Sequence, residues 1–290
     1  MITIDSISKK YKNFYAVKDV TMNLVPGEVY GLVGKNGAGK STLFKLILGL
    51  TVPYEGTVSV GNSKSQKELD TARKSIGFYM GPSFYPYLNA KDNLKYVARM
   101  KNIKDPNEVD RVLALVDLDG VKKPFKSFSL GMKQRLGIAN ALLGDPQIVL
   151  LDEPINGLDP QGILEIRDII KNLGKVHQKT VIVSSHILSE LELVADRFGI
   201  IDHGILLKEF DHSMNDDEHF LHLRTNQDDS AMSLLSELNP SMSDDGLLIN
   251  VEFLANEYIQ ILINNHIQIL EITVQKQKLE QQYFALTGGQ

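Results

Sequence analysis

The sequence has 290 residues and no cysteine, which excludes disulfides and thiol chemistry, and no apolar run approaches the ~20 residues that span a bilayer. Its formal net charge of −5 is uneven: residues 211–290 hold 3 basic and 13 acidic side chains, while residues 1–210 hold the remaining 28 basic and 23 acidic ones. An acidic final segment and a modest, dispersed basic surplus before it argue against a nucleic-acid partner.

The first motif along the chain is a glycine-rich loop, GKNGAGKS, at residues 34–41. It matches the spacing G-x-x-x-x-G-K-[ST] and lies between a strand-like run, EVYGLVG, and a helix-like run, STLFKLILGL. Glycines let successive N–H groups converge on one anion, and the helix beginning near Lys40 adds its partly positive N-terminus. Because a plain hairpin turn would need neither Lys40 for phosphates nor Ser41 for Mg²⁺, we expect a nucleoside triphosphate here. The expected binding residues are Gly34, Lys35, Asn36, Gly37, Ala38, Gly39, Lys40, Ser41 and Thr42.

Helical periodicity dominates the region after this loop. The runs NAKDNLKYVARM and PNEVDRVLALVDL have apolar residues at helical spacing, with Asn89 as an N-cap and Pro106 at a helix start. The stretch KSFSLGMKQRLGIANALLGDP (126–146) predicts a further helix capped by Ser129. A helix N-terminus with a hydroxyl and a nearby glycine binds anions, so Ser129 and Gly131 are candidate phosphate ligands. We expect a helical subdomain at about 84–143, with its helices between Asn89 and Leu143.

An apolar strand with two acidic residues at its end follows, QIVLLDEP at 147–154. On their own, two acidic residues before a proline are equally compatible with a strand that simply ends in a loop. Paired with the loop at 34–41, however, they fit a metal site, since the carboxyl end of a parallel strand beside a phosphate loop is where Mg²⁺ is held. Asp152 is the expected metal ligand, through its water shell, and Glu153 the residue that polarises an attacking water.

The rest of the chain adds one capped helix, one histidine and a separate tail. In INGLDP (155–160), Asp159 precedes Pro160 as a helix cap. In TVIVSSHIL (180–188), His186 follows a strand, a place where a lone histidine is usually a surface residue. After Phe210 the polar run DHSMNDDEH predicts a boundary, and residues 211–290 alternate strand-like and helix-like runs. No catalytic constellation is evident in this tail, so we expect a small packing or dimer-stabilising unit.

In their order and spacing, these motifs resemble those of the ATP-binding cassette (ABC) family. The family's L-S-G-G-Q signature and following [KQR]-Q-R run are matched by FSLGM and KQR at 128–135, where Leu130 and Met132 depart from the consensus. This variant resembles the bacterial branch that exports bacitracin, lantibiotics and other peptides, and the ending LEQQYFALTGG is similar to that branch's LEDVFLxLTG. The resemblance covers residues 1–210. It implies an α/β fold with a P-loop NTPase (ABC-type ATPase) core, a helical subdomain and a small C-terminal α/β appendage at 211–290.

The resemblance also implies roles for single residues. Glu153 and His186 are then catalytic, with His186 contacting the γ-phosphate, and Ser41 and Asp152 hold Mg²⁺. Tyr11 matches the aromatic residue that stacks on adenine, with Tyr15 as its rival. Because a signature serine has no role in its own site, two cassettes meet head to tail. The remaining ATP-binding residues implied in this way are Ser129, Gly131 and Asp159.

One element of the family is missing. The family ends a strand near residue 80 with a glutamine that touches Mg²⁺ and the attacking water, but no glutamine occurs from Lys67 to Lys133. Met80 or Gly81 takes its place in KSIGFYMGPSFYPYL. The hydrolytic geometry is therefore expected to differ here. The segment GPSFYPYL that follows is either internal packing or, as the resemblance implies, the surface that receives a coupling helix from a membrane subunit.

The function implied by the resemblance is ATP hydrolysis that drives a membrane exporter for a peptide, antimicrobial or drug-like substrate. The implied cofactors are ATP and Mg²⁺; the implied partners are a transmembrane permease subunit and a second cassette, identical or different. With no secretory signal pattern in MITIDSISKK, we expect a cytoplasmic protein held at the inner membrane face by the permease.

Other classes of protein fit less well. The alternative of a soluble, non-transport cassette ATPase with a regulatory or translation-associated role normally has two cassettes, and one phosphate loop is present. A DNA-repair cassette needs more than the 87 residues between Ser41 and Ser129. A GTPase needs an Asn-Lys-x-Asp element, which the sequence lacks.

Overall fold

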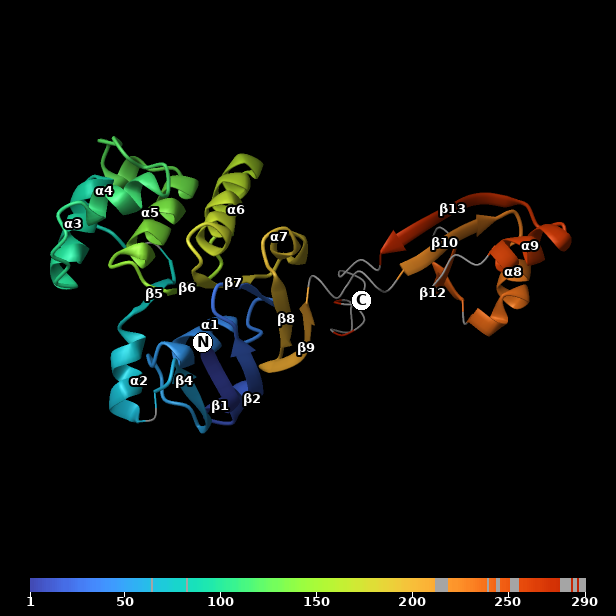
Figure 1. Ribbon diagram of the computed structural model, residues 1–290, viewed down its shortest axis with the longest axis horizontal. Helices are drawn as coiled ribbons and strands as arrows, with labels where there is room; N and C mark the ends of the chain where they lie inside the picture. The colour runs from blue at the N-terminus through green and yellow to red at the C-terminus, as the bar shows by residue number, and fades with distance from the viewer. Residues whose placement is uncertain are drawn as a thin grey trace. The chain divides into compact units, whose positions relative to one another are not determined.

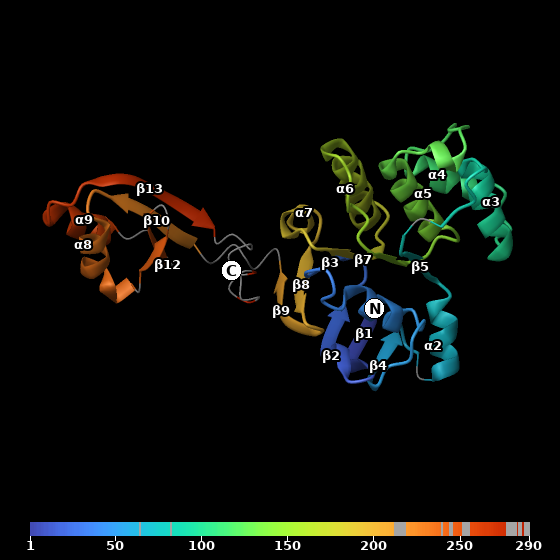
Figure 2. The ribbon, with the colours of Figure 1, turned by 180° about the vertical axis from the view of Figure 1, so that it is seen from behind.

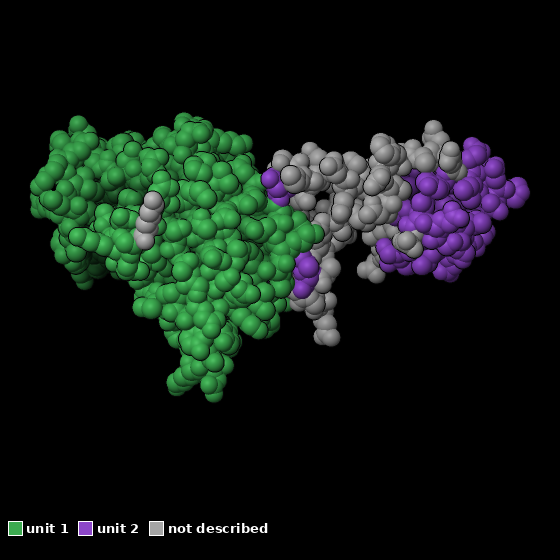
Figure 3. All heavy atoms as spheres, turned by 60° about the horizontal axis from the view of Figure 1, so that its bottom comes forward, with its two compact units in different colours: residues 1–210 green, residues 211–290 purple. Residues whose placement is uncertain are grey.

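The computed structural model describes residues 1–63, 65–81, 83–211, 219–238, 240–243, 246–250 and 256–276, together with Tyr283 and Leu286. The chain divides into two compact units, Met1–Phe210 and Asp211–Gln290, which Figure 3 colours separately. Over the described ranges, no helix combines the length and the apolar character needed to cross a membrane.

The centre of the first unit is a sheet of six strands in the order β5-β6-β7-β3-β8-β9. The pairs β5/β6, β6/β7, β7/β3 and β3/β8 are parallel. Every residue of β3 and β7 is buried, because helices cover both faces of such a sheet. The α/β core with a parallel sheet predicted from the sequence is confirmed. The strands are β3 (Val29–Val33), β5 (Ile76–Tyr79), β6 (Ile148–Leu151), β7 (Thr180–Ser185), β8 (Arg197–Asp202) and β9 (Ile205–Asp211).

A second, three-stranded antiparallel sheet, in the order β2-β1-β4, lies in the same unit. The sequence analysis did not predict it. Its inward side chains, among them Ile2, Ile4 and Ile7, are fully buried and share one hydrophobic core with α1 (Lys40–Ile47). The strands are β1 (Ile2–Tyr11), β2 (Phe14–Leu24) and β4 (Glu55–Val60).

Three helices begin where the side chains of their caps predict, whereas α4 begins at Glu108, two residues after the predicted start at Pro106. Asn89 accepts a hydrogen bond from the Asp92 N–H (2.8 Å), Ser129 from the Met132 N–H (3.3 Å), and Asp159 from the Gly162 N–H (3.0 Å). Figures 1 and 2 show α3, α4 and α5 clustered together, away from β1, β2 and β4. The helices are α2 (Gln66–Arg73), α3 (Ala90–Met100), α4 (Glu108–Ala114), η1 (Phe125–Ser127), α5 (Leu130–Leu142), α6 (Pro160–Lys175) and α7 (Leu188–Glu192).

The second unit is a four-stranded antiparallel sheet in the order β11-β12-β10-β13, with α8 and α9 on one face (Figure 1). Its own core includes Leu221, Leu223, Leu247 and Leu262. The predicted alternation of strands and helices is found, with β11 as an unpredicted addition, while most of DHSMNDDEH and of LEQQYFALTGG lies outside the described residues. The elements are β10 (His219–Thr225), α8 (Asp228–Leu234), η2 (Ser236–Leu238), β11 (Ser241–Ser243), β12 (Gly246–Asn250), α9 (Asn256–Asn264) and β13 (Ile269–Lys276).

Candidate active site

The sheet order brings three distant segments to one edge. Strands β6, β7 and β3 are neighbours and run parallel, so the segments after their carboxyl ends lie together. These segments are the glycine-rich loop, the Asp152-Glu153 pair and the Ser185-His186 pair. The Gly34 N–H donates to the Ser185 carbonyl (3.2 Å), which joins the loop to the end of β7. The ends of parallel strands are where α/β sheets bind ligands.

The loop's backbone conformation requires glycine. Gly37 and Gly39 have φ values of 86° and 111°, in the left-handed region that only glycine adopts readily. A Cβ on Gly39 would also overlap the Ala16 carbonyl oxygen. The loop encloses a cavity of about 250 Å³, lined by Phe14, Ala16, Asn36, Gly37, Ala38, Gly39, Lys40, Ser41, Thr42 and Glu153.

The Lys40 ammonium lies inside this loop. Its side chain is 5% exposed, and Nζ donates to the carbonyls of Gly34 and, at 3.2 Å, Lys35. Nζ also forms an ion pair with Glu153 Oε1 at 3.0 Å. A cation held among carbonyl oxygens at the start of a helix meets the terminal phosphates of a bound nucleotide.

Ser41 and Asp152 form the candidate metal site. The Ser41 hydroxyl donates to Asp152 Oδ2 (2.6 Å), and the Ser184 hydroxyl donates to Oδ1 (2.6 Å). In the part of the chain that the structure describes, no group of three or more His, Cys, Asp or Glu side chains gathers to hold a metal. One hydroxyl and one carboxylate fit Mg²⁺, which prefers few protein oxygens and takes its other ligands from phosphates and water.

Glu153 lies between Lys40 and His186. Its Oε2 is 2.8 Å from His186 Nδ1, while Oε1 faces Lys40. The backbone of Glu153 has φ of 49°, a rare value for a residue other than glycine, and its N–H donates to the Ser184 hydroxyl (2.9 Å). This carboxylate is 20% exposed and can accept a proton from a water molecule beside the phosphates.

Ser184 was not predicted. Its hydroxyl is fully buried and contacts both Asp152 and Glu153, which makes it part of the site. The only signal in the sequence is a hydroxyl two residues before His186 on a strand whose neighbours cannot be deduced from spacing.

Three aromatic residues lie near the end of the β1–β2 hairpin. Tyr11 is 48% exposed and pairs with Phe14 across the two strands, but Phe14, not Tyr11, lines the loop cavity. Tyr15 contacts Tyr54 edge to face, with ring centroids 6.3 Å apart. The geometry therefore adds Phe14 to Tyr11 as a candidate for adenine stacking, and the ring of Tyr15 is engaged elsewhere.

Three predicted residues lie outside the loop cavity. Ser129 and Asp159 are exposed at the N-termini of α5 and α6, and Gly131 follows in the first turn of α5. None of the three lines the cavity. The three residues thus do not share the cavity that Lys40 and Glu153 of the same chain line, and Ser129 and Asp159 are exposed.

Neither Met80 nor Gly81, the two residues that follow β5, carries a carboxamide. Met80 is half-buried, and Gly81 has φ of 101° with open space around the position of a Cβ. The departure noted in the sequence is therefore a real difference in the chemistry at this edge of the sheet.

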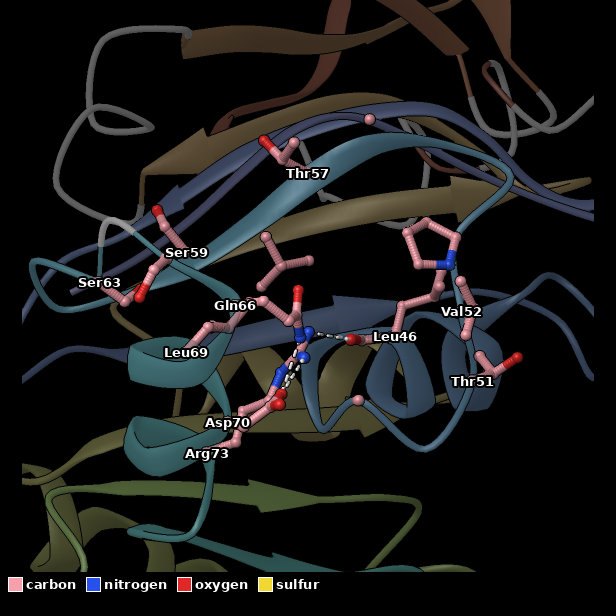
Figure 4. Close-up of a pocket in the computed structure, with 15 residues that line it drawn as sticks. Leu46, Thr51, Val52, Thr57, Ser59, Ser63, Gln66, Leu69, Asp70 and Arg73 are labelled. Atoms are coloured by element: carbon pink, nitrogen blue, oxygen red, sulfur yellow. Dashed lines mark hydrogen bonds and ion pairs between the residues drawn. The ribbon is translucent and has the colours of Figure 1, made fainter.

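A larger cavity, of about 480 Å³, lies between α1, α2 and β4 (Figure 4). Arg73 extends from α2 and donates to the Ile47 and Leu46 carbonyls (2.8 and 3.1 Å) at the end of α1, and it pairs with Asp70 at 3.6 Å. A cation at a helix C-terminus satisfies carbonyls that have no partner in the helix. The charged groups of this cavity thus stabilise the C-terminal end of α1 and are not among the residues around Lys40 and Glu153.

Known proteins with similar sequences and structures are ABC proteins. The ABC transporter family model matches residues 17–156. The bacitracin transport ATP-binding protein BcrA of Bacillus licheniformis is 36% identical over 299 residues, covering 100% of this chain and 98% of the relative. The lantibiotic transport ATP-binding protein SrtF of Streptococcus pyogenes is 43% identical over 224 residues, covering 76% and 96%.

Among solved structures, a dimeric post-hydrolysis state of the ATP-binding cassette MJ0796 bound to ADP and Pi has a TM-score of 0.66 and 27% identity, over 73% of this chain and 99% of that one. Relatives that match almost throughout, and a cassette structure that holds the products of hydrolysis, agree with the geometry around Lys40 and Glu153. The chain therefore belongs to the ABC transporter family, as an ATP-binding subunit with ATPase activity.

Proposed function

We propose that this chain drives the export of a peptide antibiotic through a separate membrane subunit, by binding Mg²⁺ and ATP between two cassettes joined head to tail. The observation that carries the proposal is the junction of Lys40, Glu153 and His186 at one sheet edge, with Ser129 exposed elsewhere. This junction supplies half of an ATP site, and Ser129 supplies part of the other half.

Each residue of the junction has a separate role in ATP hydrolysis. Lys40 holds the terminal phosphates. Ser41 and Asp152 would hold Mg²⁺, which would supply positive charge to offset that of the triphosphate. Glu153 orients a water molecule and accepts its proton, since its carboxylate is adjacent to the loop. His186, within hydrogen-bond distance of Glu153, contacts the γ-phosphate and aligns that carboxylate.

The second half of the site comes from another cassette. Ser129 and Gly131 present a helix N-terminus, a favourable environment for the γ-phosphate of a nucleotide bound to the partner. Asp159 lies at the N-terminus of the following long helix, α6. Two such surfaces meeting head to tail enclose two nucleotides, whether the two chains are identical or different.

The membrane partner is proposed to contact the helical cluster. A cavity of about 380 Å³ there is lined by Ser83, Phe84, Tyr85, Asn93, Tyr96, Val97 and Met100. Met100 is 72% exposed, and the exposed rings of Tyr85 and Tyr96 meet edge to face at 5.0 Å. An exposed apolar patch next to β5 suits a short helix of a membrane subunit. The chain then works at the cytoplasmic membrane face.

The substrate class rests on the relatives, whose names assign them to bacitracin and lantibiotic transport. The test is to express the chain with a candidate multi-helix membrane protein in a bacterium sensitive to these antibiotics. We expect the two proteins to co-purify and the cells to survive more antibiotic.

The Lys40→Ala protein should still co-purify with the membrane protein but should no longer protect the cells, because the glycine-rich loop alone does not neutralise the triphosphate. Lys45→Ala, at an exposed position of the same helix, is the matched control and should keep both. An active ATPase that associates with no membrane subunit would instead support the soluble cassette class.

A further inference from the structure

The last residue of β5 connects the active-site edge of the sheet to α5. The main-chain carbonyl of Tyr79 accepts a hydrogen bond from the Asp152 N–H (2.9 Å). Its side-chain hydroxyl donates to Gln134 Oε1, on α5. Tyr79 is 3% exposed and Gln134 is 6% exposed, so this contact between side chains is shielded from water.

The packing of α5 is shaped to accept this ring. Gly137 lies one turn after Gln134, and a Cβ at Gly137 would overlap the Tyr79 ring atoms Cε2 and Cδ2. The helix therefore approaches the ring as closely as its backbone permits. Glycine in the interior of a helix is unfavourable relative to alanine. Its presence here leaves the space that the ring occupies.

The Tyr79 hydroxyl stays a donor. Burial raises its pKa strongly, and the nearby negative charge of Asp152 raises it further. A phenol hydroxyl donates a hydrogen bond, and Gln134 Oε1 accepts it.

We propose that Tyr79 is a positioning residue that transmits the state of the nucleotide site to α5, and so to Ser129 at the start of that helix. This inference rests on the proposed function, in which Ser129 contacts the partner's ATP. Tyr79 is hydrogen-bonded through its carbonyl to Asp152, which would hold the metal, and through its hydroxyl to the helix that Ser129 caps.

The neighbouring segment offers no equivalent connection. The side chain of Met80 cannot donate a hydrogen bond, and Gly81 has none to offer. A displacement of Asp152 when Mg²⁺ and the nucleotide bind therefore reaches α5 through Tyr79 and Gln134. Loss of the hydroxyl should leave binding intact and remove the response of the helix.

The test compares amide hydrogen exchange in Leu130–Leu142 with and without Mg²⁺ and a non-hydrolysable ATP analogue, in the full-length protein. In the unmodified protein, we expect the ligand to change exchange in α5. Tyr79→Phe keeps the ring against Gly137 and should bind the analogue with unchanged affinity, but the change in α5 should be lost. In steady-state hydrolysis, kcat should fall while KM for ATP stays the same.

Gln134→Leu is the second variant and should reproduce the same loss. The double variant should show no further loss, since both changes remove one contact. Tyr30→Phe is the matched control, because Tyr30 is fully buried and its hydroxyl donates to Glu209 (2.8 Å) rather than to α5. It should lower the melting temperature and keep the response of α5.

Two results would overturn the inference. One is a Tyr79→Phe protein whose α5 responds to the analogue as the unmodified protein does. The other is an unmodified protein that binds the analogue without any change in α5. Failure of the unmodified protein to bind the analogue at all is a different result and would contradict the proposed function instead.

Discussion

At the scale of single residues, the hydroxyl of Ser184 organises the active site. It donates to Asp152 Oδ1 and accepts from the Glu153 N–H, and it is fully buried. Ser184→Ala leaves both partners short of a hydrogen bond, at a cost of about 1–3 kcal/mol. Expressed as lost stabilisation of the transition state, this cost should lower kcat/KM for ATP by roughly 5- to 150-fold. The Mg²⁺ concentration needed for half-maximal nucleotide binding should also rise.

Steady-state hydrolysis and nucleotide titrations at varied Mg²⁺ check this expectation. Ser185→Ala is the matched control: the residue is equally buried, and its hydroxyl accepts from the Ile187 N–H (3.0 Å) instead. Equal losses in the two variants would mean that Ser184 has no special effect on Asp152 and Glu153.

Sequence alone gives the candidate residues of this site and not their contacts. Lys40, Ser41, Asp152 and Glu153 belong to local patterns in which spacing and residue type suffice. Ser184 does not belong to such a pattern. It meets Asp152 and Glu153 because β7 lies between β6 and β3 in the sheet, and this order follows from long-range packing rather than from sequence order. For the same reason, the contact of Tyr79 with Gln134 could not be predicted from the sequence.

At the scale of elements, a charged network joins α4, the turn after α5 and the start of β7. Glu108 pairs with Arg111 on α4 (2.7 Å), and Arg111 is 3.8 Å from Asp145. Lys179, 3% exposed, donates to Asp145 (2.8 Å) and to the Pro146 carbonyl (2.7 Å). The network ties α4 of the helical cluster to the segments that lead into β6 and β7.

This network predicts a pH dependence of stability. The hydrogen bond from Lys179 lowers the pKa of Asp145 below its ordinary value of 3.8, and it outweighs the opposite effect of desolvation, which is small because this side chain is largely exposed. The folded state therefore binds the proton less readily than the unfolded state. The resulting stabilisation is present above pH 3.8 and is lost as the pH falls through the lower, folded-state value. Asp145→Asn should reduce stability at neutral pH and flatten its decline in acid.

Urea unfolding at a series of pH values measures this effect. Asp119→Asn removes the same charge at an exposed position of the helical cluster and is the control. An Asp145→Asn protein whose stability follows the same acid profile as the Asp119→Asn protein would contradict the assignment.

The elements also show which structural features could be predicted from the sequence and which could not. The caps at Asn89, Ser129 and Asp159 are confirmed, because each depends on one side chain and a backbone N–H three residues on. The sheet of β1, β2 and β4 was missed. Strand β1 pairs with β4 across more than forty residues of intervening chain, and such a pairing leaves no local pattern.

At the scale of the whole molecule, each unit has its own core. The buried residues of the core that surrounds α1 end at Ile201, with the partly buried Leu206 packed against them, and the second core begins at Leu221. A chain truncated after Asp211, the last residue of β9, should therefore bind a fluorescent ATP analogue as the full chain does. Equilibrium titration with circular dichroism as a folding control tests this. Lost binding in a truncated chain that is still folded would show that the second unit takes part in the nucleotide site.

Assembly of two cassettes gives the strongest test of the shared ATP site. Glu153→Gln keeps the size and hydrogen bonding of the side chain but removes the charge that orients water. Hydrolysis should stop, while ATP still bridges the cassettes. Dimers should then accumulate with ATP and Mg²⁺, and size-exclusion chromatography will detect them. If the chain pairs with itself, the purified subunit suffices; if it pairs with a different cassette, the shift requires that partner.

Adding Ser129→Arg to the Glu153→Gln protein should disperse these dimers, because the long cation crowds the position of the partner's γ-phosphate. Ser127→Arg is the matched control, since it adds the same charge on the segment that leads into α5 while leaving the Ser129 cap in place. It should leave the dimers intact. A Glu153→Gln protein that stays monomeric with ATP and Mg²⁺, alone and with every candidate partner cassette, would rule out the head-to-tail site, because an ATP held by Lys40 would then meet no Ser129 of a second cassette.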